Sequence, residues 1–490
     1  MAYGGCWMRS RARLLFAVAS FALLLPVCGF APDPSRQLGT DAIVTSAPVY
    51  DPLAALHGGE RFPRGAQLLI LRDGNAEPLV PDFAASADAR VSFDGKKVLF
   101  AGRKAATGPW QIWEFTFADR SVRQVTTDST DAIRPLYLPG WRLVYALRTT
   151  HGFQLQSARL VNTKAIEEIE GPDTRAVLPL TYMNASAVPA DVLADGRILF
   201  ESGFPLGSGS TPEMFRVYSD GSGVQSYRCD HGTAVGKGRW GGRQLANGDV
   251  VFTHGGSLAR FTSPLAHEAR IEAPQGDYAG GVAETKSGAL LVSVRGTPGA
   301  KYALRLWTPG AAASRPLMSR PSENLVDPVL VVERNKPRRH PSALHDWGYA
   351  NLLALDARIS RDDTLKGTPA SVRLDTQDPQ GKAVSFGTAP VEQDGSFFVR
   401  VPADRAIRFA LLDANGAVLR KERGWFWIRR GEQRICVGCH EGPERASENK
   451  VPAVLLRTTT PVDLTGTVKE MAPASPGAAA HDRSDVPGGN

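Results

Sequence analysis

A turn-and-strand phrase that occurs five times restricts the fold of this chain more than any other feature. The phrase reads SFDGKKVLF at residues 92–100, a tight turn with a glycine followed by a short apolar strand, and it returns with variations. Its turn glycines are Gly95, Gly140, Gly196, Gly248 and Gly288. They lie 45, 56, 52 and 40 residues apart. Spacing in this range is what the four-stranded blades of a β-propeller produce.

The residue types in each phrase suit a propeller blade. Asp-Gly or Asn-Gly supplies the positive φ of a tight hairpin turn, and the β-branched and aromatic residues that follow suit a strand buried between stacked blades. Further strands lie between the phrases, such as Trp110–Phe117, where large apolar and polar residues alternate. With Gln67–Leu71 as a closing partner strand, the phrases predict five or six blades. An array of β-sandwiches with the same turns is the alternative.

The period changes at about Asp327, which marks a second domain. A basic connector with two prolines, residues 334–341, leads into about 100 residues of short predicted strands without a helix of useful length. This pattern indicates a small β-sandwich. Its predicted strands include Asn351–Ala357, Ala370–Leu374, Phe397–Val401, Ile407–Leu412 and Trp425–Ile428.

The first 31 residues have the form of an export signal. Arginines at positions 9, 11 and 13 precede Leu14–Val27, a stretch of 14 uncharged residues that is too short to span a bilayer comfortably. Cys28 stands where a lipoprotein cysteine would, and cleavage after Ala31 is the alternative. We therefore expect a periplasmic protein that is either released or anchored in the membrane through a lipid on Cys28. No later segment is apolar enough to cross a membrane.

Near the C-terminus, Cys436-Val437-Gly438-Cys439-His440 has the C-x-x-C-H spacing of a c-type haem attachment site. The two thiols of such a site form thioether bonds to the haem vinyl groups, and the histidine is placed to supply an axial nitrogen to the iron. A redox pair of the thioredoxin type would open a helix, which Gly442 and Pro443 oppose. A structural zinc site would want a second ligand pair, and none follows His440 at regular spacing. We expect one covalent haem c, with a disulfide, a zinc site or a redox pair as alternatives.

Cys229 is left without a partner once Cys6 and Cys28 are assigned to the export signal. It is a buried apolar residue, a metal ligand with His231 or His440, or an exposed thiol, and the sequence leaves the three open. The sixth iron ligand is open as well. A vacant position would let the iron bind small molecules, whereas a filled one favours electron transfer.

Basic residues precede the haem motif and could pair with haem propionates or dock an acidic redox partner protein, unless they form a solvated strand face. They are Arg420, Lys421, Arg423, Arg429, Arg430 and Arg434. The formal net charge of +7 is modest for 490 residues and is spread along the chain, so it indicates no nucleic-acid partner.

Three strings in the second half resemble the haem-bearing middle part of hydrazine synthase alpha-subunit-like proteins. They are Val391–Ala403, Ala410–Gly416 and Gly431–Glu441. Upstream, Asp195–Phe200 and Tyr218–Gly223 resemble the TolB-like propeller of the same group. The resemblance covers about residues 67–466 and is most specific in the last 50 or so of them.

Carried over by position, the resemblance implies that Cys436 and Cys439 bind a haem and that His440 is the motif histidine. In the alpha subunit the motif histidine resembles a zinc ligand shared with a propeller cysteine, a role that Cys229 could take here, while a tyrosine just after the motif binds the iron. In this chain Glu444 stands four residues after His440, and no tyrosine follows Tyr349. The resemblance therefore implies the architecture but not hydrazine synthesis.

We accordingly predict an all-β chain in six segments. These are an export signal at 1–31, a linker or strap at 32–65, a TolB-like β-propeller at 66–326, a β-sandwich at 327–432, a haem c attachment segment at 433–466 and a disordered tail at 467–490. The expected function is that of an exported monohaem cytochrome-like protein in electron transfer or haem redox chemistry. Its propeller would hold a partner or a small-molecule ligand.

Two other functions stay open. One is a haem-dependent oxidoreductase. The other is a periplasmic binding or scaffold module whose C-x-x-C-H is structural, sensory or zinc-binding.

Overall fold

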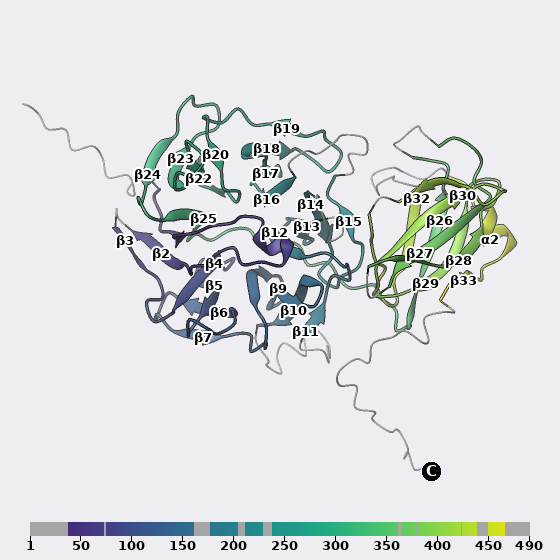
Figure 1. The fold of residues 1–490 in the computed structure, drawn as a ribbon, viewed down its shortest axis with the longest axis horizontal. Helices are drawn as coiled ribbons and strands as arrows, with labels where there is room; N and C mark the ends of the chain where they lie inside the picture. Colours follow the sequence, from purple (N-terminus) through teal and green to yellow (C-terminus); the bar gives the residue numbers. More distant parts are fainter. Residues whose placement is uncertain are drawn as a thin grey trace, which may run out of the picture.

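Two all-β units lie side by side in the computed structural model of this chain (Figure 1). The structure describes residues 38–72, 75–160, 177–203, 211–228, 238–360, 365–378, 381–422, 424–438 and 449–465. In these residues, six sheets form the first unit and two sheets the second. Helix is limited there to the 3-10 turn η2 (Ala54–His57) and the helix α2 (Ala453–Arg457), and neither could cross a membrane. The predicted all-β class is confirmed.

The six sheets of the first unit are the blades of a propeller. From the innermost strand outward, the first blade consists of β25 (Asn324–Leu330), β1 (Ala42–Ala47), β2 (Gln67–Arg72) and β3 (Asn75–Pro78). The second consists of β4 (Ala85–Val91), β5 (Lys97–Arg103), β6 (Gln111–Thr116) and β7 (Val122–Gln124). The third consists of β8 (Ala132–Leu138), β9 (Arg142–Thr149), β10 (Gly152–Arg159) and β11 (Val177–Pro179). The fourth blade consists of β12 (Ala187–Val192), β13 (Ile198–Gly203), β14 (Pro212–Val217) and β15 (Gln225–Ser226). The fifth consists of β16 (Arg239–Gln244), β17 (Val250–His254), β18 (Ser257–Phe261) and β19 (Ala269–Arg270). The sixth has β20 (Asp277–Tyr278) and β21 (Ala283–Glu284) innermost, then β22 (Leu290–Arg295), β23 (Ala303–Trp307) and β24 (Arg315–Met318). Apolar side chains fill the space between neighbouring blades.

The five repeated phrases are the hairpins that join the innermost strand to the second strand in blades two to six. All five turn glycines have positive φ, between 73° and 93°, as the predicted turn chemistry requires. In the first of them the Gly95 N–H donates to the Ser92 carbonyl at 3.0 Å. The first blade has no such phrase because its innermost strand, β25, comes from the other end of the propeller sequence. Six blades are therefore built from five phrases.

Antiparallel pairing of β25 with β1 closes the propeller, with Val326 opposite Thr45. The sequence predicts a linker or strap at residues 32–65 and closure by the strand Gln67–Leu71. The structure instead has a blade strand, β1, within 32–65, while Gln67–Leu71 lies in β2, the third strand from the axis. The boundary at 326 likewise divides β25. Because β1 and β25 are far apart in the chain, no turn joins them directly, and their pairing could not be predicted from a local sequence pattern.

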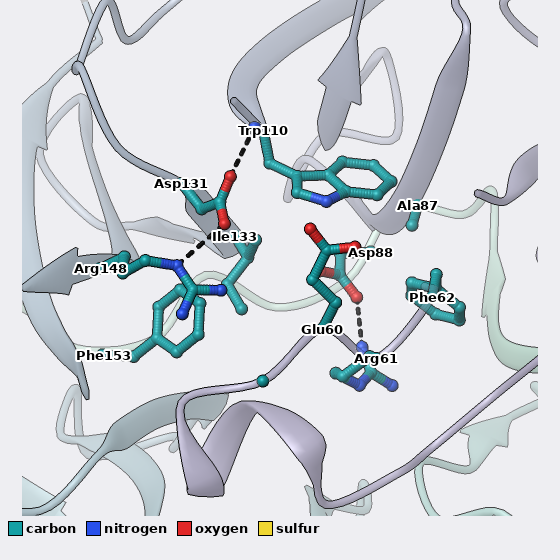
Figure 2. Close-up of a pocket in the computed structure, with 11 residues that line it drawn as sticks. Glu60, Arg61, Phe62, Ala87, Asp88, Trp110, Asp131, Ile133, Arg148 and Phe153 are labelled. Carbon is teal, nitrogen blue, oxygen red and sulfur yellow. Dashed lines mark hydrogen bonds and ion pairs between the residues drawn. The ribbon is translucent and has the colours of Figure 1, made fainter. Parts of the chain in front are cut away.

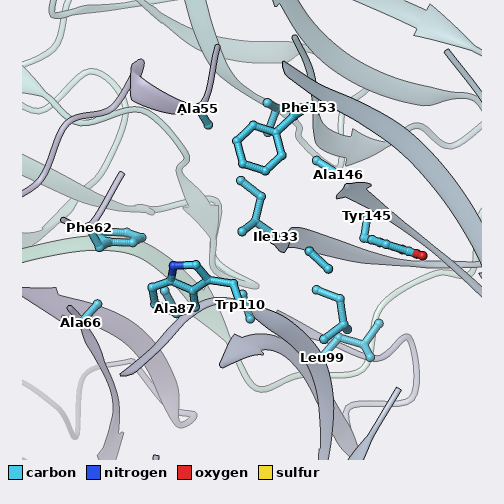
Figure 3. Close-up of a cluster of buried hydrophobic side chains, with 14 of the residues drawn as sticks. Ala55, Phe62, Ala66, Ala87, Leu99, Trp110, Ile133, Tyr145, Ala146 and Phe153 are labelled. Carbon is cyan, nitrogen blue, oxygen red and sulfur yellow. The ribbon is translucent and has the colours of Figure 1, made fainter. Parts of the chain in front are cut away.

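The segment between β1 and β2, residues 48–66, is a strap over the propeller axis. Figure 3 shows its Ala55 and Phe62 facing Trp110, Ile133 and Phe153 from blades two and three, in one buried apolar cluster. The strap therefore adds to the apolar packing between these two neighbouring blades.

The second unit is a sandwich of two four-stranded sheets around an apolar core. One sheet has the order β32 (Gln433–Gly438), β26 (Tyr349–Asp356), β29 (Phe397–Pro402) and β33 (Val462–Asp463). The other has the order β28 (Ala383–Pro390), β27 (Ser371–Gln377), β30 (Ile407–Leu412) and β31 (Val418–Lys421).

One boundary and one strand of the second unit differ from those predicted. Residues 433–466 are not a separate segment, because β32 and β33 are the two edge strands of one sandwich sheet. The predicted strand Trp425–Ile428 makes only one isolated bridge, between Phe426 and Ile407. The adjoining Trp427 turns to the propeller instead of continuing a ladder.

Candidate functional site

Cys436, the first cysteine of the C-x-x-C-H motif, lies in the edge strand β32. This strand pairs in parallel with β26, where Cys436 is opposite the buried Ala354. The thiol is therefore turned toward the sandwich core, against which it packs half-buried, and it is not in a disulfide. Its neighbour Ile435 points the other way and is 64% exposed. Cys439 and His440 lie outside the described residues.

Two glycines set the path of the chain into and along this strand. Gly431 has φ 74°, and a Cβ there would stand 1.8 Å from the His345 carbonyl oxygen. At Gly438, within the motif, a Cβ would stand 2.7 Å from the Ile359 carbonyl oxygen. Side chains at either position would push β32 away from the connector or from the end of β26. The first three residues of the motif are thus held close against the backbone of their own domain.

The segment that leads into β32 is docked on the fourth blade of the propeller. Trp427 is fully buried among apolar side chains of blades three and four, and its indole Nε1 donates to the Gly221 carbonyl at 2.9 Å. Arg429 Nε donates to the Asp220 carbonyl at 3.0 Å. Arg434 Nη2 donates to the Val224 carbonyl at 2.6 Å. These partners follow β14, and Asp220 and Gly221 belong to the string Tyr218–Gly223 that resembles the alpha-subunit propeller.

Titratable groups gather at the same edge of the sandwich. Burial raises the pKa of the Cys436 thiol, and the Arg434 guanidinium opposes that shift. Burial also raises the pKa of Glu422 to about 7, against the smaller opposing effects of Arg434 and Arg420. The pKa of Glu432 rises for the same reason. Arg434 is thus the cation that faces the thiol and two carboxyl groups.

The basic residues before the motif have divided roles. Arg429 is buried and forms an ion pair with Asp404 at 2.8 Å, and Arg434 contacts the propeller. Both are therefore taken up by contacts within the chain. Lys421 and Arg430 are exposed, and Arg423 lies outside the described residues. Arg420 is buried as well. Among the described members of this set, only Lys421 and Arg430 match the predicted role of cations that face solvent.

The structure leaves the predicted metal ligands untested. Cys229, His231 and His440 lie outside the described residues, and Cys28 does so as well. Within the described part of the chain, no three His, Cys, Asp or Glu side chains gather as a metal site. The segments that precede Cys229 and His440 do meet, because Arg434 in β32 donates to the Val224 carbonyl in the loop before β15.

A pocket that the sequence analysis missed lies under the strap, between blades two and three. Figure 2 shows Trp110 above it, with the ion pair of Arg148 and Asp131 on one side and that of Arg61 and Asp88 on the other. Its volume of about 20 Å³ holds one water-sized molecule. No contiguous motif could have revealed it, because its walls come from the strap and two different blades.

Comparison with known proteins shows a family similarity in the second unit and supports the fold. Residues 359–441 match the family described as the hydrazine synthase alpha subunit middle domain. The search of curated proteins gave no match. Among solved structures, Kuenenia stuttgartiensis hydrazine synthase matches 85% of this chain and 71% of its own chain, with 18% identity and a TM-score of 0.74. TolB from Acinetobacter baumannii matches 60% of this chain and 67% of its own, with 14% identity and a TM-score of 0.43. The resemblance to hydrazine synthase alpha-subunit-like proteins is thus confirmed at the level of domain and architecture.

Proposed function

We propose that this chain, whose residues 359–441 match the middle domain of the hydrazine synthase alpha subunit, is an exported protein that carries one covalent haem c on Cys436 and Cys439 and acts in electron transfer or haem redox chemistry. The C-x-x-C-H motif, whose first three residues lie on an edge strand of that domain, carries the proposal. Bound haem would supply an iron that exchanges single electrons.

The residues around Cys436 are compatible with a covalent haem c. Cys436 is not in a disulfide and lies half-buried on an edge strand. Because its thiol faces the core, attachment to a porphyrin would require this edge strand to turn outward. In this position the cysteine would hold the haem edge, and His440 would supply an axial nitrogen. Arg434 and Trp427 would hold the strand against the propeller, which fixes the orientation of the group relative to blade four. The propeller would then hold the redox partner or the substrate.

The deciding experiment is the intact mass and haem stain of the protein made in a periplasm with haem-ligation machinery. We expect the added mass of one haem in the wild type, and its loss in the Cys436→Ala, Cys439→Ala variant. Cys229→Ser is the matched control, since it removes a thiol but leaves the motif intact. An unmodified wild-type chain would refute the proposal.

Spectroscopy of the haem-loaded protein separates a carrier from an enzyme. A low-spin spectrum that does not respond to small ligands supports electron transfer, because both axial positions are then filled. A five-coordinate spectrum that shifts with small ligands supports a haem-dependent oxidoreductase. Labelling with a radioactive fatty acid, lost in Cys28→Ala, tests anchoring in the membrane.

A second candidate function is a binding or scaffold module in which Cys229 and His440 hold zinc. It is favoured by one contact, from Arg434 to the Val224 carbonyl, because these residues lie a few positions before the two ligands. Metal analysis of wild type and Cys229→Ser tests it. We expect one zinc per chain in the wild type and less in the variant, whereas equal zinc content in both would exclude the role of Cys229.

A further inference from the structure

The chain enters the propeller and leaves it at the same end. The turns of the five repeated phrases lie at this end, which we call the hairpin end, because each joins the innermost strand of its blade to the second strand. In blade one the end of β25 and the start of β1 lie here instead, with Leu330 opposite Ala42. The Thr40 hydroxyl donates to the Val331 carbonyl at 2.8 Å, and the Val331 N–H donates to the Asp41 carbonyl at 2.9 Å. The chain that comes from the export signal therefore joins the fold beside the strand end that leads into the basic connector.

The connector lies on the hairpin end and is bonded to two of its turns. The Arg334 N–H donates to the Phe93 carbonyl in the turn of blade two at 2.9 Å, and the Arg338 N–H donates to the Ala194 carbonyl in the turn of blade four at 3.0 Å. A Cβ on Gly196 would clash with the Arg338 carbonyl oxygen, so this glycine lets the connector lie directly on the turn. The connector backbone is thus fixed along a line from blade two to blade four.

The connector side chains form a basic strip. The connector contains four arginine or lysine residues and no acidic residue, and Lys336, Arg338 and Arg339 are exposed. Among the described residues, the side chains of Lys336 and Arg338 have no hydrogen-bond or ion-pair partner. Glu333, directly before the connector, is the one acid that adjoins it in the sequence. The strip therefore has a net positive charge and two cations that are free to contact a partner outside the chain.

The hairpin turns around the axis do not neutralise this strip. In the turns of blades four and five the acidic side chains are held in ion pairs, Asp195 with Arg197 at 2.6 Å and Asp249 with Arg260 at 2.9 Å. The turn of blade two has one acid and two lysines, and the turns of blades three and six each have one basic residue and no acid. Around the axis, the hairpin end is therefore positively charged.

An exposed tryptophan lies in the turn between the two that the connector contacts. Trp141 is in the turn of blade three and is 58% exposed. Its φ is 60°, a left-handed conformation that bulky residues rarely adopt and that is retained mainly at sites with a function. Tryptophan together with basic side chains is the combination that proteins present to the headgroup region of a bilayer.

We propose that the hairpin end docks on an anionic phospholipid surface, with the basic strip over the headgroup phosphates and Trp141 in the headgroup region. This rests on the proposed export and on no property of the haem. The predicted lipid anchor supports it, because Cys28 lies 12 residues before Thr40, and such a stretch spans at most about 40 Å. A lipid on Cys28 would hold the hairpin end toward the membrane and the opposite end, with the strap, away from it. A lipid combined with a basic patch anchors more firmly than either alone.

Cosedimentation with vesicles tests the docking surface. The protein is the full chain as exported, and the vesicles contain equal parts of phosphatidylglycerol and phosphatidylcholine, or phosphatidylcholine alone. We expect tighter binding to the anionic vesicles, with a difference that shrinks as salt is added. A lipid on Cys28 would bind both kinds of vesicle alike, so the difference between them reports the protein surface.

The double variant Lys336→Gln, Arg338→Gln should lower the binding constant for anionic vesicles about 30-fold, because each cation near such a surface contributes about a factor of five. The matched control is Lys382→Gln, Lys421→Gln, which removes the same charge from exposed positions on the sandwich and should keep the binding of the wild type. All four side chains are exposed, so neither variant should change the unfolding temperature.

Fluorescence gives a second measurement. Anionic vesicles made with brominated phosphatidylcholine should quench the tryptophan fluorescence of the wild type, and Trp141→Phe should lose this quenching. The proposal is overturned if both kinds of vesicle bind alike, if the Lys336→Gln, Arg338→Gln variant binds like the wild type or no more weakly than the control, or if Trp141→Phe keeps the quenching. Haem staining of the same protein separates this proposal from the function proposed above. A chain without haem that docks refutes the haem alone, and a chain with haem that binds both vesicles alike refutes the docking alone.

Discussion

Trp427 gives the sharpest test of how the sandwich is held on the propeller. Its side chain is fully buried between blades three and four, and its Nε1 bonds to the Gly221 carbonyl. Replacement by alanine removes a large buried aromatic group and leaves that carbonyl without its donor. Buried Trp to Ala changes cost about 3–5 kcal/mol in unfolding free energy. We expect Trp427→Ala to lose about this much.

Because Trp427 belongs to one unit and packs in the other, the variant should also uncouple them. We expect calorimetry of the wild type to give one main transition and that of Trp427→Ala to give two. Trp427→Phe keeps most of the apolar contact and loses one hydrogen bond, so it should cost about 1 kcal/mol.

The matched control is Trp141→Ala, whose side chain is 58% exposed on the turn between β8 and β9. Exposed substitutions usually change stability by less than about 0.5 kcal/mol. If Trp427→Ala behaves like this control in urea unfolding and keeps a single transition, the contact with blade four does not hold the two units together.

Three further outcomes are expected. Arg61→Met should lower the unfolding free energy by about 3–5 kcal/mol in urea titrations, because Asp88 and Asp327 then lose the cation between them, and a loss below 1 kcal/mol would contradict this. The raised pKa of Glu422, about 7 in the fold against 4.5 as its ordinary value, means that its proton is held more tightly in the folded state. Stability should therefore fall as the pH rises from about 4.5 through 7, and Glu422→Gln should flatten this part of the profile; an unchanged profile would exclude the shift. Gly431→Ala should disturb β32, seen as faster hydrogen exchange of its amides, whereas unchanged exchange would show that the turn tolerates a side chain.

Turns, strands and motifs that are formed by consecutive residues could be predicted from the sequence. The five phrases are local turns, since a glycine with positive φ and the strand after it are set by neighbouring residues, and the structure has all five as hairpins. Most predicted sandwich strands also exist. The C-x-x-C-H motif is likewise recognisable from the sequence alone, because the signature of haem attachment is the spacing of the two cysteines and the histidine along the chain.

What the tertiary structure decided is how distant segments meet. Pairing of β25 with β1 completes the first blade, and no repeated phrase marks this pairing because the two strands come from opposite ends of the propeller sequence. Trp427, predicted as part of a strand, leaves its sheet because burial in the propeller outweighs one more ladder. Arg90 and Arg134 look like ordinary strand residues in the sequence, and only ring closure brings them to one hollow. Turns and covalent motifs depend on neighbours in the chain, whereas buried charge and domain contact depend on neighbours in space.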